Sequence, residues 1–195
     1  MNNVVKEYFE KIAKDWKNND NLDLVRQLLK EVNLQKGDKV IDAGCGKGII
    51  TPLLYELTQE KVIGIDFSKG MIEEAMQINN DETKYQYICC DFIEFESNYL
   101  FDSIIIYNAY PHFLDINSLK NKAYALLKPH GSLVIMHSLS RDNINNHHKC
   151  VNCCTIARDL ETFEVESIPF LDKFDFVKGL DEADRYLLIL KKKQK

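Results

Sequence analysis

Short segments rich in β-branched residues alternate with segments of helical periodicity along this chain of 195 residues. Five of them lie at 39–43, 61–66, 85–89, 102–107 and 132–137. Several are continuously apolar, as is typical of strands buried on both faces of a parallel sheet. Because helical segments with short connections separate these strands, the sequence predicts an α/β fold in which helices cover both faces of the sheet.

Flanking segments extend this pattern toward both ends of the chain. Residues 4–16 and 22–32 each have the spacing of an amphipathic helix. Two further strands are predicted near 173–178 and 184–191, and we expect them to form an antiparallel pair at the edge of the sheet. No internal repeat or Pro/Gly-rich linker interrupts the pattern, so the sequence predicts a single domain.

The charge balance disfavours nucleic acid and membrane as partners. The chain has 30 acidic and 25 basic residues, a net charge of −5, so its surface has no general attraction for phosphate backbones or anionic lipid. No apolar run approaches the ~20 residues of a membrane span. Charged residues interrupt the N-terminal segment every few positions, which argues against a signal peptide. We therefore expect a cytoplasmic protein with reduced cysteines.

Three glycines at alternate positions, Gly44, Gly46 and Gly48, follow the first predicted strand. Glycines at the carboxyl end of a strand allow a tight turn and the close approach of a ligand. Their spacing differs from the Gly-x-Gly-x-x-Gly of dinucleotide-binding proteins, and no Ser or Thr follows Gly46-Lys47, as a P-loop requires. The alternative is a strand-to-helix turn that binds nothing.

Two aspartates narrow the choice of ligand for this loop. Asp66 ends the neighbouring strand, where a carboxylate can accept hydrogen bonds from both hydroxyls of a ribose. The alternative is an aspartate at the start of the next helix, beside Ser68 as its N-cap. Asp42 lies beside the glycines, where it would repel a phosphate and favour a cation. The amino and sulfonium groups of S-adenosylmethionine meet that requirement.

Five motifs follow one another along the chain: Val-Ile-Asp-Ala-Gly-Cys-Gly-Lys-Gly at 40–48, Ile-Gly-Ile-Asp-Phe-Ser at 63–68, Cys-Asp-Phe at 90–92, the segment 101–113, and Leu-Leu-Lys-Pro-His-Gly at 126–131. In this order they resemble the motifs of class I S-adenosylmethionine-dependent methyltransferases (type 11/25-like, small-molecule branch), over nearly the full length of the chain. His130 replaces a glycine of the family pattern. The resemblance implies a Rossmann-like fold: a seven-stranded, mostly parallel sheet with helices on both faces and an antiparallel edge strand.

The resemblance also implies a site for S-adenosylmethionine, with S-adenosylhomocysteine as the product. The glycine loop would contact the methionine part of the cofactor, Asp66 the ribose, and Asp91 the adenine amino group. Independently of the family, Asp91 follows a strand end, where ligands of such sheets bind; the alternative is a helix cap. The expected cofactor-binding residues are Asp42, Gly44, Cys45, Gly46, Asp66, Phe67, Met71, Cys90, Asp91, Phe92 and Asn108.

Residues after the fourth and fifth strands are the candidates for the acceptor side. His112 lies where a general base is expected, and the alternative is a structural histidine. His137 ends the fifth strand, and the helix after it places Arg141 and His148 on one polar face. Some uncharacterised methyltransferases have a similar His-Ser-x-Ser-Arg segment. We therefore predict His112, His137, Arg141 and His148 as catalytic residues.

A group of soft metal ligands follows that polar face. His148, Cys150, Cys153 and Cys154 have a spacing that zinc can use, but no second Cys-x-x-Cys closes a tetrahedral site. We therefore predict no bound metal and interpret the cysteines as packed or surface thiols. Metal or metalloid binding by this group is the alternative.

These features predict an enzyme that transfers a methyl group in line from S-adenosylmethionine to an unidentified small molecule. We divide the single domain, 1–195, into an N-terminal helical lid or cap at 1–34, a cofactor-binding core at 35–137, and an acceptor-side helix with closing strands at 138–195. We expect a monomer or homodimer. The alternatives are a non-catalytic nucleotide- or metal-sensing module on the same fold, and a NAD-dependent reductase, which fits Asp66 but not the glycine spacing.

Overall fold

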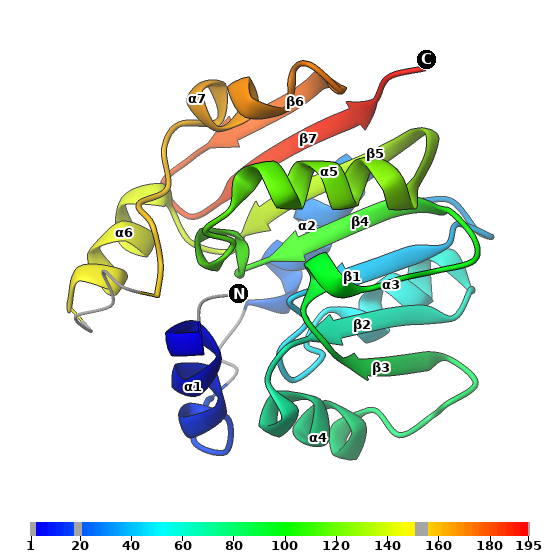
Figure 1. Ribbon diagram of the computed structural model, residues 1–195, viewed down its shortest axis with the longest axis vertical. Coiled ribbons are helices and arrows are strands. Elements are labelled where there is room, and N and C mark those ends of the chain that lie inside the picture. The colour runs from blue at the N-terminus through cyan, green and yellow to red at the C-terminus, as the bar shows by residue number, and fades with distance from the viewer. Residues whose placement is uncertain (1–2, 18–20, 151–155, 195) are drawn as a thin grey trace.

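The computed structural model describes residues 3–17, 21–150 and 156–194. Its centre is one sheet of seven strands in the order β3-β2-β1-β4-β5-β7-β6 (Figure 1). The strands are β1 (Val40–Ala43), β2 (Val62–Asp66), β3 (Tyr85–Cys89), β4 (Phe101–Tyr107), β5 (Leu127–His137), β6 (Phe174–Asp181) and β7 (Tyr186–Lys192). Each of the seven segments predicted to be extended overlaps one of these strands.

The first five strands are parallel, and β7 runs antiparallel to both of its neighbours, β5 and β6. The antiparallel pair predicted at the edge of the sheet is confirmed, since β6 and β7 form it. Within the pair, β7 is the strand antiparallel to β5, and β6 takes the outermost position. The edge strand β6 therefore runs in the same direction as the first five strands.

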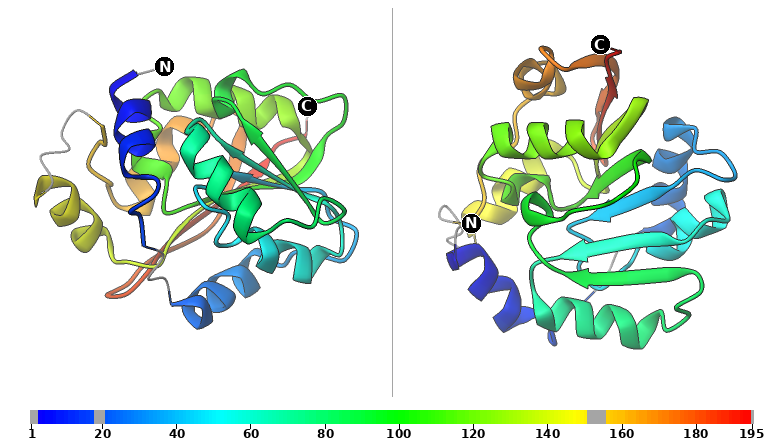
Figure 2. Two further views of the ribbon diagram at one scale, coloured as in Figure 1. Left: turned by 90° about the horizontal axis from the view of Figure 1, so that it is seen from below. Right: turned by 45° about the vertical axis from the view of Figure 1, so that its right-hand side comes forward.

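Helices cover both faces of the sheet, with α2 and α3 on one side and α5 on the other (Figure 2). The helices are α1 (Asn3–Ile12), α2 (Leu22–Val32), α3 (Thr51–Thr58), α4 (Lys69–Ile78), α5 (Ile116–Leu126), α6 (Arg141–Cys150) and α7 (Phe163–Ser167), with 3₁₀ helices η1 (Phe92–Glu94), η2 (Tyr110–His112) and η3 (Ile168–Phe170). Within the described ranges, no helix combines the length and the apolar character that crossing a membrane requires.

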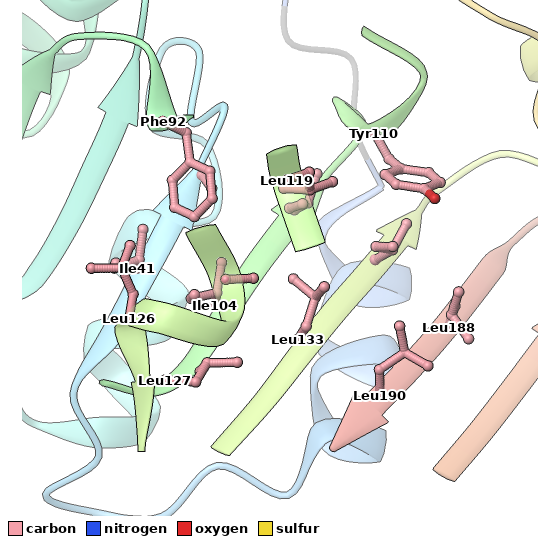
Figure 3. Packing of buried hydrophobic residues seen from close by; sticks show 14 of the residues in the cluster. Ile41, Phe92, Ile104, Tyr110, Leu119, Leu126, Leu127, Leu133, Leu188 and Leu190 are labelled. Atoms are coloured by element: carbon pink, nitrogen blue, oxygen red, sulfur yellow. The ribbon is translucent and has the colours of Figure 1, made fainter. Parts of the chain in front are cut away.

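Strand β4 shows why the central strands are continuously apolar. Ile104 packs with Phe92 and Leu119 in the core under α5 (Figure 3), whereas the next residue, Ile105, packs with Leu28 in the core under α2. Successive side chains of a strand point to opposite faces, so a sheet covered on both sides needs apolar residues at every position. This arrangement leaves the carboxyl ends of the parallel strands as the part of the sheet where a ligand can bind.

The turn at the start of β5 holds His130 in an unusual backbone conformation. Leu127 pairs with Phe101 of β4, and the register shifts before Ser132 pairs with Ser103. Within the intervening turn, His130 has a φ of 62°, in the left-handed region that favours glycine. His130 therefore adopts the conformation that the glycine of the family pattern would adopt without strain.

Candidate functional site

A cavity of about 460 Å³ lies at the carboxyl ends of β1, β2 and β4. Its wall contains all eleven predicted cofactor-binding residues and one of the four predicted catalytic residues, His112. Helix α1, which lies beyond these strand ends in Figure 1, contributes Val5 and Phe9 to the wall. Carboxylates predominate among the charged groups of the wall, which are Asp42, Lys47, Asp66, Asp91, Glu94 and Asp115.

The glycine loop after β1 needs glycine for its conformation and for its packing. Gly44, Gly46 and Gly48 have φ values of 73°, 52° and 72°, which L side chains rarely adopt. The backbone N–H of Gly44 donates to the carbonyl oxygen of Ile65 at 2.8 Å and joins the loop to β2. A Cβ at Gly44 would lie 2.8 Å from the Cβ of Ala109, so glycine permits the chain after β4 to approach the loop.

Asp66, at the end of β2, connects the glycine loop to helix α4. Its Oδ2 accepts a hydrogen bond from the N–H of Gly46 at 2.9 Å, and its Oδ1 accepts one from the N–H of Ser68 at 2.8 Å. Burial raises the pKa of Asp66 to about 6, although these two hydrogen bonds oppose the shift. The carboxylate therefore lies both at the start of α4 and on the cavity wall. The interpretation as an aspartate at the start of a helix and the interpretation as a ribose-binding group are compatible.

Asp42 is a second buried carboxylate of the wall. Its Oδ2 accepts a hydrogen bond from Thr51 Oγ1 at 2.6 Å. Burial raises the pKa of Asp42 to about 7, and the charge of Asp66 adds to the increase. Lys47, the one lysine or arginine on the described part of the wall, already pairs with Glu74 at 3.3 Å. This end of the cavity therefore favours a positively charged ligand.

Apolar side chains of η1 and α4 line another part of the cavity wall. Asp91 begins η1, and its Oδ1 accepts a hydrogen bond from the N–H of Ile93 at 3.0 Å. Phe92 and Met71 are buried on the wall, and the ring of Phe92 lies 6.2 Å from that of Phe113. Apolar side chains beside a carboxylate oxygen suit a flat heterocycle that carries an amino group.

Asn108 holds the ends of β4 and β5 together at the cavity. Its φ is 51°, which asparagine tolerates better than most residues. Its Oδ1 accepts a hydrogen bond from the N–H of Ser138 at 3.1 Å, and its Nδ2 donates to the Oγ of Ser138 at 3.2 Å. The sequence places Asn108 at this site but gives no indication that its side chain bonds to the neighbouring strand.

His112 is the predicted catalytic residue that lies on the cavity wall. Its Nδ1 is 2.9 Å from the carbonyl oxygen of Ile156. Its ring lies 4.8 Å from that of Phe9 and 5.2 Å from that of His148. Burial lowers the pKa of His112 to about 4, so the ring is neutral near pH 7.

Glu10 fastens helix α1 over the cavity. Its carboxylate accepts hydrogen bonds from the N–H of Gly70 at 3.1 Å and from Ser68 Oγ at 2.8 Å, at the first turn of α4. These hydrogen bonds lower the pKa of Glu10. Glu10 was not among the predicted site residues, because it is an exposed polar position of an amphipathic helix and the apolar periodicity carries no information about it.

Comparison with known proteins identifies the family. Residues 34–185 match the model of a methyltransferase domain family. The chain belongs to this methyltransferase family. A malonyl-[acyl-carrier protein] O-methyltransferase of Acetivibrio thermocellus is 34% identical over 95 residues, which cover 48% of this chain and 33% of that protein. The matched segments span less than half the length of the curated relatives.

Solved structures confirm the methyltransferase fold. The N-methyltransferase NodS of Bradyrhizobium japonicum, in complex with S-adenosylhomocysteine, has a TM-score of 0.71 at 16% identity and covers 97% of this chain and 99% of its own. A Haloferax volcanii methyltransferase solved with the Trm112 activator has a TM-score of 0.77 at 14% identity, with 98% of both chains covered. The family and the NodS complex support the prediction of S-adenosylmethionine as the cofactor.

Three predicted catalytic residues of this methyltransferase domain, His137, Arg141 and His148, lie outside the cavity wall. His137 is 2% exposed, and burial lowers its pKa to about 3. Arg141 forms an ion pair with Asp181 at 3.3 Å. The structure therefore brings His148 close to His112 and places Arg141 beside β6, and the catalytic role of all four residues stays a prediction.

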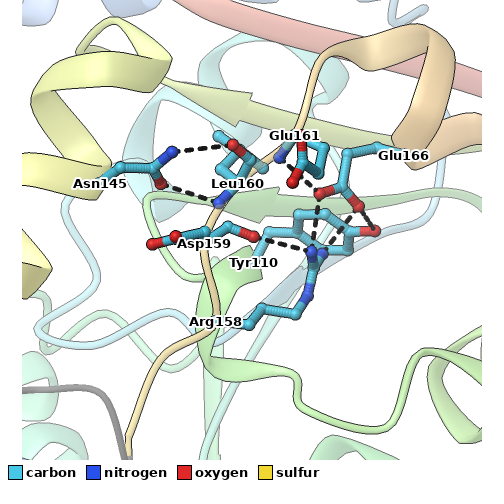
Figure 4. A network of polar contacts seen from close by, with 7 residues as sticks. All are labelled: Tyr110, Asn145, Arg158, Asp159, Leu160, Glu161 and Glu166. Carbon is cyan, nitrogen blue, oxygen red and sulfur yellow. Dashed lines mark hydrogen bonds and ion pairs between the residues drawn. The ribbon is translucent and has the colours of Figure 1, made fainter.

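A buried ion pair in the methyltransferase domain supports the segment that carries His112. Glu166 of α7 accepts a hydrogen bond from Tyr110 Oη at 2.9 Å and two from the guanidinium of Arg158, at 2.6 and 2.9 Å (Figure 4). This network holds residues 156–167 against η2. The sequence analysis missed it, because these residues follow the part of the chain where the strand–helix pattern loosens.

Among the described residues, no three His, Cys, Asp or Glu side chains are grouped so that they could hold a metal ion. Cys153 and Cys154, and the side chain of Cys150, lie outside the described part of the chain. The metal-binding alternative depends on them.

Proposed function

We propose that this chain binds S-adenosylmethionine in the cavity and transfers its methyl group to a small molecule. The proposal rests chiefly on one observation: eleven residues selected from separate sequence segments lie on the wall of a single cavity. The volume of about 460 Å³ is within the range of small-molecule sites. The wall also suits the cofactor chemically. Asp42 favours its positive charges, and the backbone at Gly44 has no room for a Cβ, which would lie 2.8 Å from the Cβ of Ala109.

Each part of the cofactor has a candidate partner. Asp66 would accept hydrogen bonds from the ribose hydroxyls, and Asp91 from the adenine amino group beside Phe92. The glycine loop and Asn108 would hold the methionine part. Because the sulfonium sulfur already activates the methyl carbon, in-line transfer requires chiefly alignment by the protein, and removal of a proton when the acceptor needs it.

We assign the segment 1–34 to a lid or cap, 35–137 to cofactor binding, and 138–195 to the acceptor side. Support for the lid comes from Val5 and Phe9 on the cavity wall and from the hydrogen bonds of Glu10 to α4. A monomer or homodimer remains our expectation for the assembly.

A non-catalytic sensing module is the second candidate function, and the comparisons do not favour it. The matching family and the relatives named above are methyltransferases. The metal-sensing form of this candidate depends on cysteines outside the described ranges. The enzyme is therefore the function that the site supports best.

Calorimetric titration of the full chain tests the cofactor assignment. We expect S-adenosylmethionine to bind and NAD not to bind. The change Asp66→Ala should weaken binding at least tenfold, about 1.4 kcal/mol, because two charge-assisted hydrogen bonds to the ribose are lost. The control Asp23→Ala changes an exposed aspartate of α2 and should leave the affinity unchanged. Unchanged affinity in a folded Asp66→Ala protein, or binding of NAD, would contradict the proposal.

A further inference from the structure

We propose that the methyl acceptor is an uncharged molecule that presents a hydroxyl group to Nε2 of His112, and that the cavity disfavours acceptors with a negative charge near the reacting atom. This inference rests on the proposed function and adds the chemical class of the substrate. It follows from the tautomer of His112, from the charges of the wall, and from the surface beside the histidine.

The hydrogen bond to Ile156 determines which nitrogen of His112 carries a proton. A carbonyl oxygen can only accept, so Nδ1, at 2.9 Å, is the donor and Nε2 keeps its lone pair. The ring is buried and neutral near pH 7, and it lies on the cavity wall. A ligand that meets Nε2 must therefore supply the proton of the hydrogen bond.

The described wall has no cation available for an anionic acceptor. Lys47 is its one lysine or arginine, and its Nζ lies 3.3 Å from the Glu74 carboxylate and 3.4 Å from the carbonyl oxygen of Lys14. The other charged groups of the described wall are acidic, Asp42, Asp66, Asp91, Glu94 and Asp115, so they offer no attraction for an anion. A carboxylate or phosphate on the acceptor would then be buried without a partner, which is costly.

Helix α1 contributes apolar residues to the wall beside His112, whose ring also lies 5.2 Å from that of His148. The rings of His112 and Phe9 are 4.8 Å apart in an edge-to-face arrangement. Val5 and Ile156 are buried in the same small cluster, against which Phe9 packs. This surface favours an acceptor whose hydroxyl is attached to an apolar, ring-shaped body, because burial of that body is favourable and an aromatic edge suits a flat ring.

In the proposed step, the acceptor oxygen forms a bond to the methyl carbon while the carbon–sulfur bond breaks. The electron pair of the broken bond stays on sulfur, which gives neutral sulfur in S-adenosylhomocysteine. The hydroxyl proton passes to Nε2 of His112, and the resulting imidazolium releases a proton to water.

Phenol and benzoate test the charge requirement, because they are similar in size and only benzoate is negatively charged at pH 7. Each probe is titrated into the full chain saturated with S-adenosylhomocysteine, and binding is followed by saturation-transfer NMR. We expect phenol to bind, and we expect the affinity for benzoate to be lower by roughly tenfold or more. Benzoate binding as tight as phenol, or absence of phenol binding to a protein that binds S-adenosylhomocysteine, would overturn the proposal. Failure to bind S-adenosylhomocysteine would instead overturn the proposed function.

A second measurement tests His112 itself. The change His112→Phe keeps a ring and removes both nitrogens, so we expect phenol binding to weaken roughly tenfold while S-adenosylhomocysteine still binds. The control His147→Phe alters an exposed histidine outside the wall and should change neither affinity. In the unsubstituted protein, the imidazole ¹⁵N spectrum should show the proton on Nδ1. A proton on Nε2, or phenol binding unchanged by His112→Phe, would contradict the inference.

Discussion

At the scale of single residues, positive φ values occur where an element ends or the chain turns. The non-glycine residues with a positive φ are Asn33 after α2, Gln59 after α3, Asn108 after β4 and His130 in the turn of β5. Asparagine enters this region at low cost, whereas a histidine does so at a cost of about 1 kcal/mol. His130 is exposed, so its side chain gains little packing in return.

We expect His130→Gly to raise the free energy of unfolding by about 0.5 kcal/mol. Relief of the left-handed conformation outweighs the greater entropy that glycine gives to the unfolded chain. Denaturant unfolding with an unchanged m-value would measure the gain. The matched control His130→Ala should give no gain, and equal stabilisation by alanine would show that the side chain rather than the backbone is responsible.

Residues at strand ends explain what sequence reasoning achieved for the site and where it stopped. Motif residues such as Asp66 and Asp91 follow strands whose carboxyl ends meet at one edge, so the sequence alone places them together. His137 also ends a strand, but its side chain is buried beside the ring of Tyr186 and does not line the cavity. Arg141 finds its partner, Asp181, forty positions along the chain, and no local pattern records such a pairing.

At the scale of elements, helix α1 is attached to the rest of the site through side chains rather than through the sheet. Glu10 bonds to the first turn of α4. A Cβ at Gly70 would lie 2.9 Å from the Cβ of Ala13, so glycine there lets α4 approach the residue that follows α1. Phe9 packs against the ring of Phe67 at 6.0 Å. Few interactions therefore decide whether the helix covers the cavity.

We expect Glu10→Gln to increase amide hydrogen exchange in α1 about threefold to tenfold, because the charge-assisted bonds to Gly70 and Ser68 weaken at an exposed position. Exchange followed by mass spectrometry would measure the change, with α5 as an internal reference. Glu7→Gln, an exposed change on the same helix, is the control. Equal protection of α1 in the Glu10 and Glu7 variants would show that Glu10 does not fasten the helix.

At the scale of the whole molecule, stability should depend on pH through two buried carboxylates. The pKa of Asp42 is about 7 and that of Asp66 about 6, both above the usual range because of burial. The folded protein therefore keeps protons that the unfolded chain has released, so its stability falls as the pH rises from about 4 to about 7. This sign is opposite to that of an ordinary paired aspartate.

We expect Asp42→Asn to remove much of this loss. The substitution changes the free energy of unfolding by an amount that depends on pH. This change should be more favourable at pH 8 than at pH 4 by at least about 1 kcal/mol, since one pKa unit corresponds to 1.36 kcal/mol. Denaturant unfolding at the two pH values measures it, with Asp23→Asn as an exposed control. A difference that is equal at both pH values would contradict the raised pKa of Asp42.

Most of the fold could be predicted from the sequence, because strands that are buried on both faces, such as β4, have apolar residues at nearly every position. The order of the closing strands was not readable in this way. The segments of β6 and β7 predict an antiparallel pair, but which of them pairs with β5 depends on long-range packing, and β7 takes that place. Segment 156–167 carries no periodic pattern, so the Glu166 network was also beyond prediction.

The inner position of β7 has a consequence for biosynthesis. Strand β6 leaves the ribosome first, yet its one hydrogen-bonded neighbour in the described sheet is β7, which is made afterwards. Until β7 emerges, β5 and β6 both expose unpaired backbone groups that invite association with other nascent chains. Because β6 has no other strand to pair with in the described sheet, it can join the sheet only together with β7 or after it.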